Sequence, residues 1–150
     1  MTGPLPVVAR VAALHRVDLF AGIPGRVLVA VAEASDEMLV DAGSTIIEEG
    51  AVEDHLFVVV DGRVRVHRGG STLVELGPGA IVGELAVLVP EPRSATVTAL
   101  DATHLLKVRK PVLDELLLDW PELAHGVIAS LVARLRAAAG HVDPTGGESP

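Results

Sequence analysis

The chain has 150 residues, a formal net charge of −8 and no cysteine. Disulfides and cysteine-based metal centres are therefore excluded, and the acidic balance argues against binding a nucleic-acid backbone. Aromatic residues make up only 2% of the chain, so stacking surfaces for single-stranded nucleic acid are nearly absent. We expect one domain with an aliphatic core, located in the cytoplasm or forming the cytosolic part of a larger protein, with no membrane segment in this chain.

Residues 1–34 show helical periodicity. A first amphipathic helix is predicted over about residues 5–19, with Val8 and Leu14 among the apolar positions on its buried face. The stretch "FAGIPG" then breaks the helix, because it contains two glycines and a proline. A second helix is predicted to run to about residue 34. This segment therefore precedes the main domain as a pair of short helices.

Residues 35–109 change to short valine-rich runs separated by turn signals, which is typical of a β-sandwich or barrel. Val64 and Val66 alternate with polar residues, and Asp61-Gly62 and Gly69-Gly70 predict two hairpins. The basic strip "RVRVHR" is interpreted as the solvent-facing side of a strand. Residues 110–140 are helical again, with prolines at positions 111 and 121 opening two helices and Gly140 ending the second. Residues 141–150 form a polar tail that we expect to be flexible.

The segment "GELAVLVPEPRSATV", residues 83–97, combines a glycine, a lone carboxylate and a lone arginine in apolar surroundings. A short helix starting after Gly83 would present free amides to an anion, and Arg93 can add a charge-assisted contact. Glu84 cannot bind the same anion, but it can accept from a neighbouring hydroxyl such as a ribose 2′-OH. The spacing alone is equally compatible with an exposed loop arginine and a helix-terminal carboxylate.

This segment resembles the phosphate-binding cassette of the cyclic nucleotide-binding domain family, whose members bind cAMP or cGMP in a β-barrel like that of the catabolite activator. "AGSTIIEEGAVEDHLFVVVDGRVRV" resembles the leading strands of that family, and "LGPGAIVGE" resembles the lead-in to its cassette. The resemblance covers about residues 19–136. It implies an α+β, mainly β fold: an eight-stranded jelly-roll barrel flanked by N-terminal helices and by C-terminal hinge and lid helices.

The resemblance also implies roles for individual residues. Arg93 would pair with the cyclic phosphate, Glu84 would accept from the ribose 2′-OH, and Ser94 would influence the choice between cAMP and cGMP. The remaining cassette positions would supply amides or close approach to the phosphate: Gly83, Leu85, Ala86 and Ala95. The expected base pocket has an apolar wall and a cap from the lid helix: Val66, Val74, Ile128, Leu131 and Arg134.

Other sites are poorly supported. The six histidines form no HxH or HExxH motif, so we expect no metal site and no prosthetic group. No nucleophile elbow is present, and we expect no enzyme activity. Only 14 residues follow Arg136, too few for a helix-turn-helix, so a transcription factor is disfavoured for this chain.

The resulting hypothesis is a regulatory module that binds a cyclic nucleotide, cAMP in the first instance, and moves its C-terminal helices on binding. The alternative is a ligand-independent interaction module of the same fold. The effector partner is unknown, and a homodimer is left open.

Overall fold

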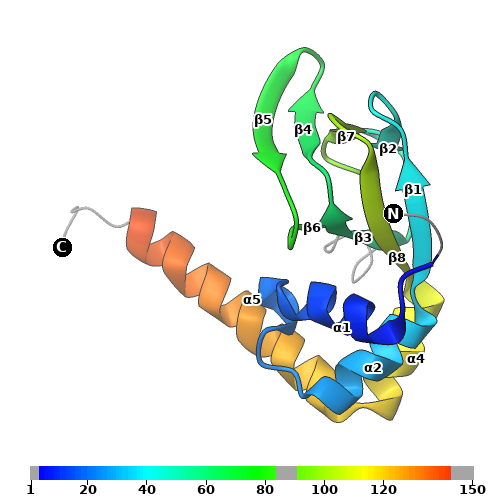
Figure 1. The fold of residues 1–150 in the computed structure, drawn as a ribbon. Coiled ribbons are helices and arrows are strands. Elements are labelled where there is room, and N and C mark those ends of the chain that lie inside the picture. The colour runs from blue at the N-terminus through cyan, green and yellow to red at the C-terminus, as the bar shows by residue number, and fades with distance from the viewer. Residues whose placement is uncertain (1–3, 84–90, 143–150) are drawn as a thin grey trace.

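The computed structural model describes residues 4–83 and 91–142. Two β-sheets stand above a layer of helices, and α5 (Pro121–Val142) extends away from that layer (Figure 1). The strands within the described residues are β1 (Asp36–Val40), β2 (Thr45–Ile47), β3 (His55–Asp61), β4 (Val64–Arg68), β5 (Ser71–Leu76), β6 (Ile81–Val82), β7 (Thr96–Ala99) and β8 (Thr103–Arg109).

One sheet has the strand order β1-β8-β3-β6 and the other has the order β2-β7-β4-β5, and every pairing is antiparallel. Eight strands in two four-stranded sheets with these crossovers form a jelly roll, so the fold class expected from the sequence is confirmed. The predicted hairpin at Gly69-Gly70 is also confirmed, because β4 and β5 pair on either side of it.

The predicted hairpin at Asp61-Gly62 is wrong. β3 pairs with β8 and β6, whereas β4 pairs with β5 and β7, so the chain crosses from one sheet to the other at this turn. Gly62 has φ +98°, and a Cβ there would lie 2.6 Å from the Oγ1 of Thr103. Gly62 therefore allows a sharp, crowded turn as expected, but this turn carries the chain into the opposite sheet and does not return it beside β3.

β3 is buried on both faces. Val58 belongs to a hydrophobic core shared with the helices, whereas Phe57 and Val59 belong to the core between the two sheets. β8 is likewise buried on both faces, because Leu106 packs in the core shared with the helices and Leu105 packs in the core between the sheets. The near-continuous apolar run "HLFVVV" reflects this double burial, since a strand with one solvated face alternates instead.

The helical layer consists of α1 (Val7–His15), the 3₁₀ turn η1 (Asp18–Phe20), α2 (Gly25–Ala34), α4 (Lys110–Asp119) and α5. α1 is shorter than predicted because Val17 adopts an extended conformation, which turns the chain and lets Val17 and Leu19 enter the core. Val8 was expected on the buried face but is 81% exposed. α5 continues through Gly140, which was predicted to end it.

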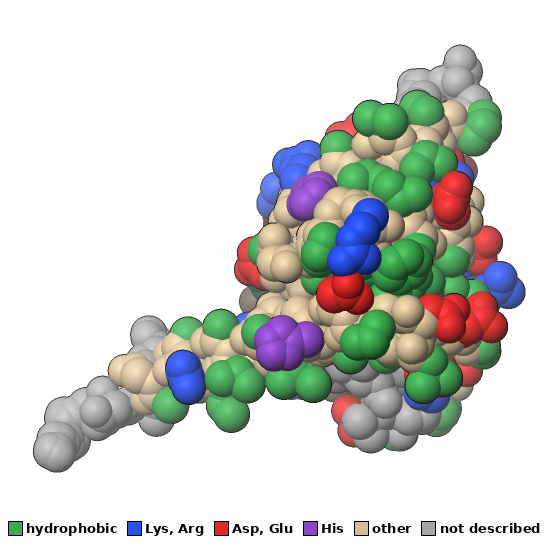
Figure 2. All heavy atoms as spheres, turned by 90° about the horizontal axis from the view of Figure 1, so that it is seen from below, with side chains coloured by type: hydrophobic (Ala, Val, Ile, Leu, Met, Phe, Trp, Pro, Cys, Tyr) green, Lys and Arg blue, Asp and Glu red, His purple; other side chains and the backbone are tan. Residues whose placement is uncertain are grey.

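The first half of α5 packs on the helical layer and the second half does not. Leu123 and Val127 are buried, and Ser130 Oγ donates to Asp18 O at 3.3 Å. Beyond them, Leu135 is 71% exposed, and seen from below α5 shows hydrophobic side chains along its projecting length (Figure 2). No single helix in the described ranges is long and apolar enough to cross a bilayer; α4 and α5 pass that test only as a pair, bent by 110° between them.

A polar cluster ties α1 to the barrel. Glu37 on β1 accepts hydrogen bonds from the Leu5 amide at 2.8 Å, from Arg10 on α1 at 3.1 Å and from His104 on β8 at 2.5 Å. Burial alone would raise the pKa of Glu37, but these hydrogen bonds and the charges of His104 and Arg10 outweigh it and lower the pKa. The carboxylate therefore links the N-terminal segment to the first sheet.

Candidate functional site

A cavity of about 260 Å³ opens at the end of the barrel next to the described part of the cassette. Small-molecule pockets begin at about 300 Å³, so this space is close in size to a site for a compact ligand. It is bordered by both sheets and by the segment that leads into β7: Ile47, Val66, Leu76, Ile81, Val82, Gly83, Glu91, Pro92, Arg93, Ser94, Ala95 and Val97.

Arg93 is only 5% exposed, although it carries a charge. Its Nη1 donates to Gly83 O at 3.2 Å and its Nη2 donates to the carbonyl of His55 at 2.5 Å, whereas its Nε is buried with no partner among the described residues. Burial lowers the pKa of Arg93, and the charges of Glu53 and Asp54 partly oppose that shift. No carboxylate in the described ranges lies within ion-pair distance of it. A buried cation in this state favours an anion as its counter-charge.

Gly83 makes room for that guanidinium. Its φ is +82°, a conformation that L side chains rarely adopt. A Cβ at this position would lie 2.5 Å from Arg93 Nη1 and 3.0 Å from His55 O. The sequence predicted a glycine that lets a ligand approach the backbone, and the structure adds that the glycine makes space for the arginine.

The backbone of Arg93 is fixed by a second pair of contacts. Its N–H donates to Ala51 O at 2.9 Å, and its carbonyl accepts from Gly50 N–H at 2.8 Å. These bonds hold the segment before β7 against the turn after β2. Ser94 is exposed and Ala95 is buried, and both border the cavity beside Arg93.

The predicted cassette residues Glu84, Leu85 and Ala86 lie outside the described residues. The structure brings together the other cassette positions: Gly83, Arg93, Ser94 and Ala95.

The predicted base pocket is only partly assembled. Val66 borders the cavity, whereas its cross-strand partner Val74 is 44% exposed and does not. Leu76, which the sequence reasoning missed, borders it instead.

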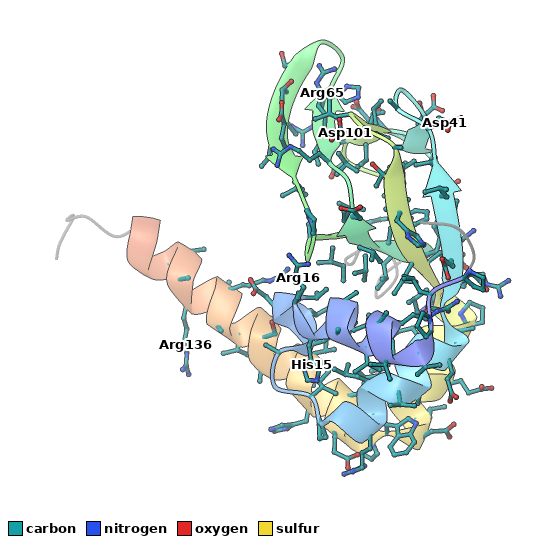
Figure 3. The ribbon with its side chains drawn as sticks, in the orientation of Figure 1. His15, Arg16, Asp41, Arg65, Asp101 and Arg136 are labelled. Carbon is teal, nitrogen blue, oxygen red and sulfur yellow. The ribbon has the colours of Figure 1, made fainter. Side chains whose placement is uncertain are left out.

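The three predicted cap residues on α5 do not border the cavity either: Ile128 is 61% exposed, Leu131 packs against the helical core, and Arg134 lies on the exposed second half of the helix. Arg136, two residues further on, points away from the barrel (Figure 3). α5 thus stands clear of the cavity in this structure.

The sequence analysis did not predict two further contributions to the site, and only one of them has a signal in the sequence. The carbonyl of His55 binds Arg93, and a backbone acceptor leaves no trace in residue type. Arg68 at the end of β4 donates from its Nε to Ser94 O at 2.8 Å. It shares the parity of Val64 and Val66 along the strand, which is the signal that could have pointed to it, although the Arg68 side chain itself is exposed.

Comparison with known proteins agrees with this arrangement. The family model "Cyclic nucleotide-binding domain" matches residues 37–119. A cyclic nucleotide-gated potassium channel from Mesorhizobium japonicum is 38% identical over 123 residues, which are 82% of this chain and 34% of the channel. A CRP-like cAMP-activated global transcriptional regulator from Mycobacterium tuberculosis is 25% identical over 82% of this chain and 57% of the regulator. The chain thus spans only about a third to somewhat over half of these relatives.

Two solved structures extend the likeness to three dimensions. The N-terminal domain of a transcriptional regulator from Streptomyces coelicolor superposes with a TM-score of 0.79 and 31% identity, covering 86% of this chain and 94% of that domain. The regulatory domain of Toxoplasma gondii PKA, solved with cAMP, gives a TM-score of 0.69 and 26% identity, covering 73% of this chain and 44% of that one. The chain belongs to the cyclic nucleotide-binding domain family.

Proposed function

We propose that this chain is a non-enzymatic sensor module that binds a cyclic nucleotide, with cAMP as the first candidate. The observation that carries the proposal is Arg93, a cation buried at a cavity, for which the described residues provide no partner to its Nε and no carboxylate within ion-pair distance. A cyclic phosphate would supply the missing negative charge and further acceptors. The absence of cysteine fits action in the reducing cytoplasm.

The apolar border of the cavity supports a nucleotide over a free inorganic anion. Val66, Leu76 and Val97 line it from three strands, and they offer a surface for a base or sugar but nothing for a bare phosphate. Pockets that bind organic ligands combine a mostly apolar lining with a few placed polar groups. The relative solved with cAMP makes this nucleotide the first to test.

Titration calorimetry with cAMP and with cGMP tests the proposal directly. The wild-type chain should bind at least one of them, and Arg93→Ala should weaken that binding by about 100-fold or more, because charged hydrogen bonds are lost. Arg63→Ala is the matched control, since Arg63 is an exposed arginine paired with Glu75 at 3.3 Å. Absence of heat and of any thermal shift with both nucleotides at millimolar concentration would instead favour the ligand-independent interaction module.

We further propose that binding moves α4 and α5. Leu113 and Leu116 of α4 share a core with Leu123 of α5, and that core also contains one face of β3 and β8. The other face of these strands packs in the core between the sheets, which includes the cavity residues Val82 and Val97. A ligand can shift the helices only to the extent that it binds one arrangement better than the other.

A further inference from the structure

The peptide group between Ser94 and Ala95 is held from its carbonyl side. Ser94 O accepts the hydrogen bond from Arg68 Nε at 2.8 Å. No cis peptide is found among the described residues, and in a trans peptide the N–H points opposite to the carbonyl. The Ala95 amide is therefore directed away from Arg68. Ala95 is only 8% exposed, and its amide has no acceptor among the described residues.

An unpaired amide in a buried residue is costly unless a partner is supplied. This one belongs to a residue that borders the cavity, two positions after Arg93. Among the described residues, two donors close together in sequence thus lack a partner, the Nε of Arg93 and the amide of Ala95. An anion is the kind of group that accepts from such donors.

Arg68 reaches this peptide because of the register of its strand. In β4, Val64 is buried and Val66 borders the cavity, and Arg68 is the next residue of the same parity. The pairing of β4 with β7 runs regularly through Val66–Val97, which brings the end of β4 beside the segment entering β7. Arg65 has the opposite parity and bonds instead to Thr72 and Gly70 at the β4–β5 hairpin (Figure 3).

The charge of Arg68 is available to the peptide. Among the described residues no carboxylate lies within ion-pair distance of Arg68, unlike Arg63, which pairs with Glu75. A cationic donor on a carbonyl polarises the whole peptide group and strengthens the N–H on its far side as a donor. The hydrogen bond from Arg68 also fixes the plane of the peptide, so ligand binding does not bear the entropy cost of ordering the Ala95 amide.

We propose that Arg68 is a positioning residue for the anion site: it orients and polarises the Ser94–Ala95 peptide so that the Ala95 amide donates to the bound phosphate. The proposal rests on the cyclic nucleotide function proposed above. It assigns a second arginine to the site, an exposed one that does not border the cavity and acts through the backbone peptide at the cavity edge.

The test compares three variants by calorimetry with cAMP, or with cGMP if the wild type binds only that nucleotide. Arg68→Ala should weaken binding by about tenfold, the scale of one charged hydrogen bond. Arg68→Lys should recover most of this loss because it keeps a charged donor. Arg65→Ala, which removes an arginine from the opposite face of the same strand, should bind like the wild type.

The NMR chemical shift of the Ala95 amide proton distinguishes a positioning role of Arg68 from a general loss of stability. On ligand saturation the Ala95 amide proton should shift downfield in the wild type and in Arg65→Ala, and the shift should be smaller in Arg68→Ala. If Arg68→Ala does not fold, Arg68→Gln replaces it: it offers a neutral donor and should fall between the alanine and lysine variants.

The two proposals fail in different ways. If the wild type binds and Arg93→Ala does not, but Arg68→Ala binds as tightly as the wild type, the role of Arg68 is overturned and the nucleotide function stands. Equal losses in Arg68→Ala and Arg65→Ala would also overturn it, since they would show a general charge effect. If the wild type binds neither nucleotide, both proposals fall.

Discussion

At the scale of single residues, the site depends on how a charged side chain is kept buried without a ligand. Arg93 uses two backbone carbonyls, those of Gly83 and His55, in place of a carboxylate. Carbonyls satisfy N–H groups but carry no net charge, and among the described residues Glu53 and Asp54 act on the cation only from beyond ion-pair distance. A planar guanidinium with several fixed donors suits this task, whereas a lysine would offer one compact charge.

The contact between Gly83 and Arg93 gives a sharp prediction. Gly83→Ala should destabilise the fold by about 1–2 kcal/mol through the left-handed backbone conformation and should also weaken cAMP binding by about tenfold or more, because the new Cβ displaces the guanidinium. Gly43→Ala is the control: its φ is +89° and nothing lies within 4 Å of the Cβ, so only stability should suffer. Urea unfolding and calorimetry measure the two effects. Equal affinities in the two variants would contradict the prediction.

Residue type and spacing drew attention to Arg93 and Gly83 but were equally compatible with an exposed loop arginine, and the resemblance to the phosphate-binding cassette selected them. Neither the spacing nor the resemblance pointed to Arg68. "RVRVHR" was interpreted as solvent-facing, and Arg68 is indeed exposed, but its contact with Ser94 O depends on strand parity and on where β7 begins. The cap residues were assigned by resemblance to a position on α5, and the packing of Leu123 and Val127 decides where that helix lies.

At the scale of elements, the attachment of α1 to the barrel depends on the ionised Glu37. Its pKa is lowered in the folded state, so its carboxylate adds stability above the ordinary glutamate value of about 4.3, and this contribution is lost as the pH falls through the folded-state value. Glu37→Gln should therefore be less stable than the wild type at pH 7, and the gap should narrow towards pH 3.

Urea midpoints at several pH values measure that gap. Glu75→Gln is the matched control, because Glu75 makes an exposed ion pair with Arg63 that is worth little. A gap between wild type and Glu37→Gln that stays constant from neutral to acid pH would show that the ionised carboxylate does not hold α1.

The sequence predicted the elements better than their connections. Turn residues report local backbone angles, and Gly62 does adopt the positive φ that its turn signal implied. The same angle is compatible with a return beside β3 or a crossing to the other sheet, and only the pairing of β3 with β8, far along the chain, decides between them. Likewise α1 ended early because burial of Val17 outweighed helical periodicity.

At the scale of the whole molecule, the cavity shares residues with the core between the sheets, whereas the helices pack against the opposite face of β3 and β8. We expect cAMP to change the position of α5 relative to the barrel. Because the chain has no cysteine, labels can be attached at Leu39→Cys on β1, 71% exposed in the wild type, and at Arg136→Cys on α5. Pulsed electron spin resonance should show a shift in the mean distance when ligand is added.

The control pair keeps both labels on the barrel, at Leu39→Cys and at Leu73→Cys on β5, where the native side chain is 50% exposed. Its distance distribution should not change with ligand. If the pair that includes α5 behaves like the barrel pair while calorimetry confirms binding, then the helices do not carry the signal.

The shared helical core has a consequence for how such a module can be built into other proteins. Residues before the barrel, such as Leu14 and Leu28, and residues after it, such as Leu113 and Leu123, pack into one hydrophobic cluster. A domain fused upstream and a domain fused downstream would thus be attached to the same layer, and one rearrangement of that layer would reach either of them.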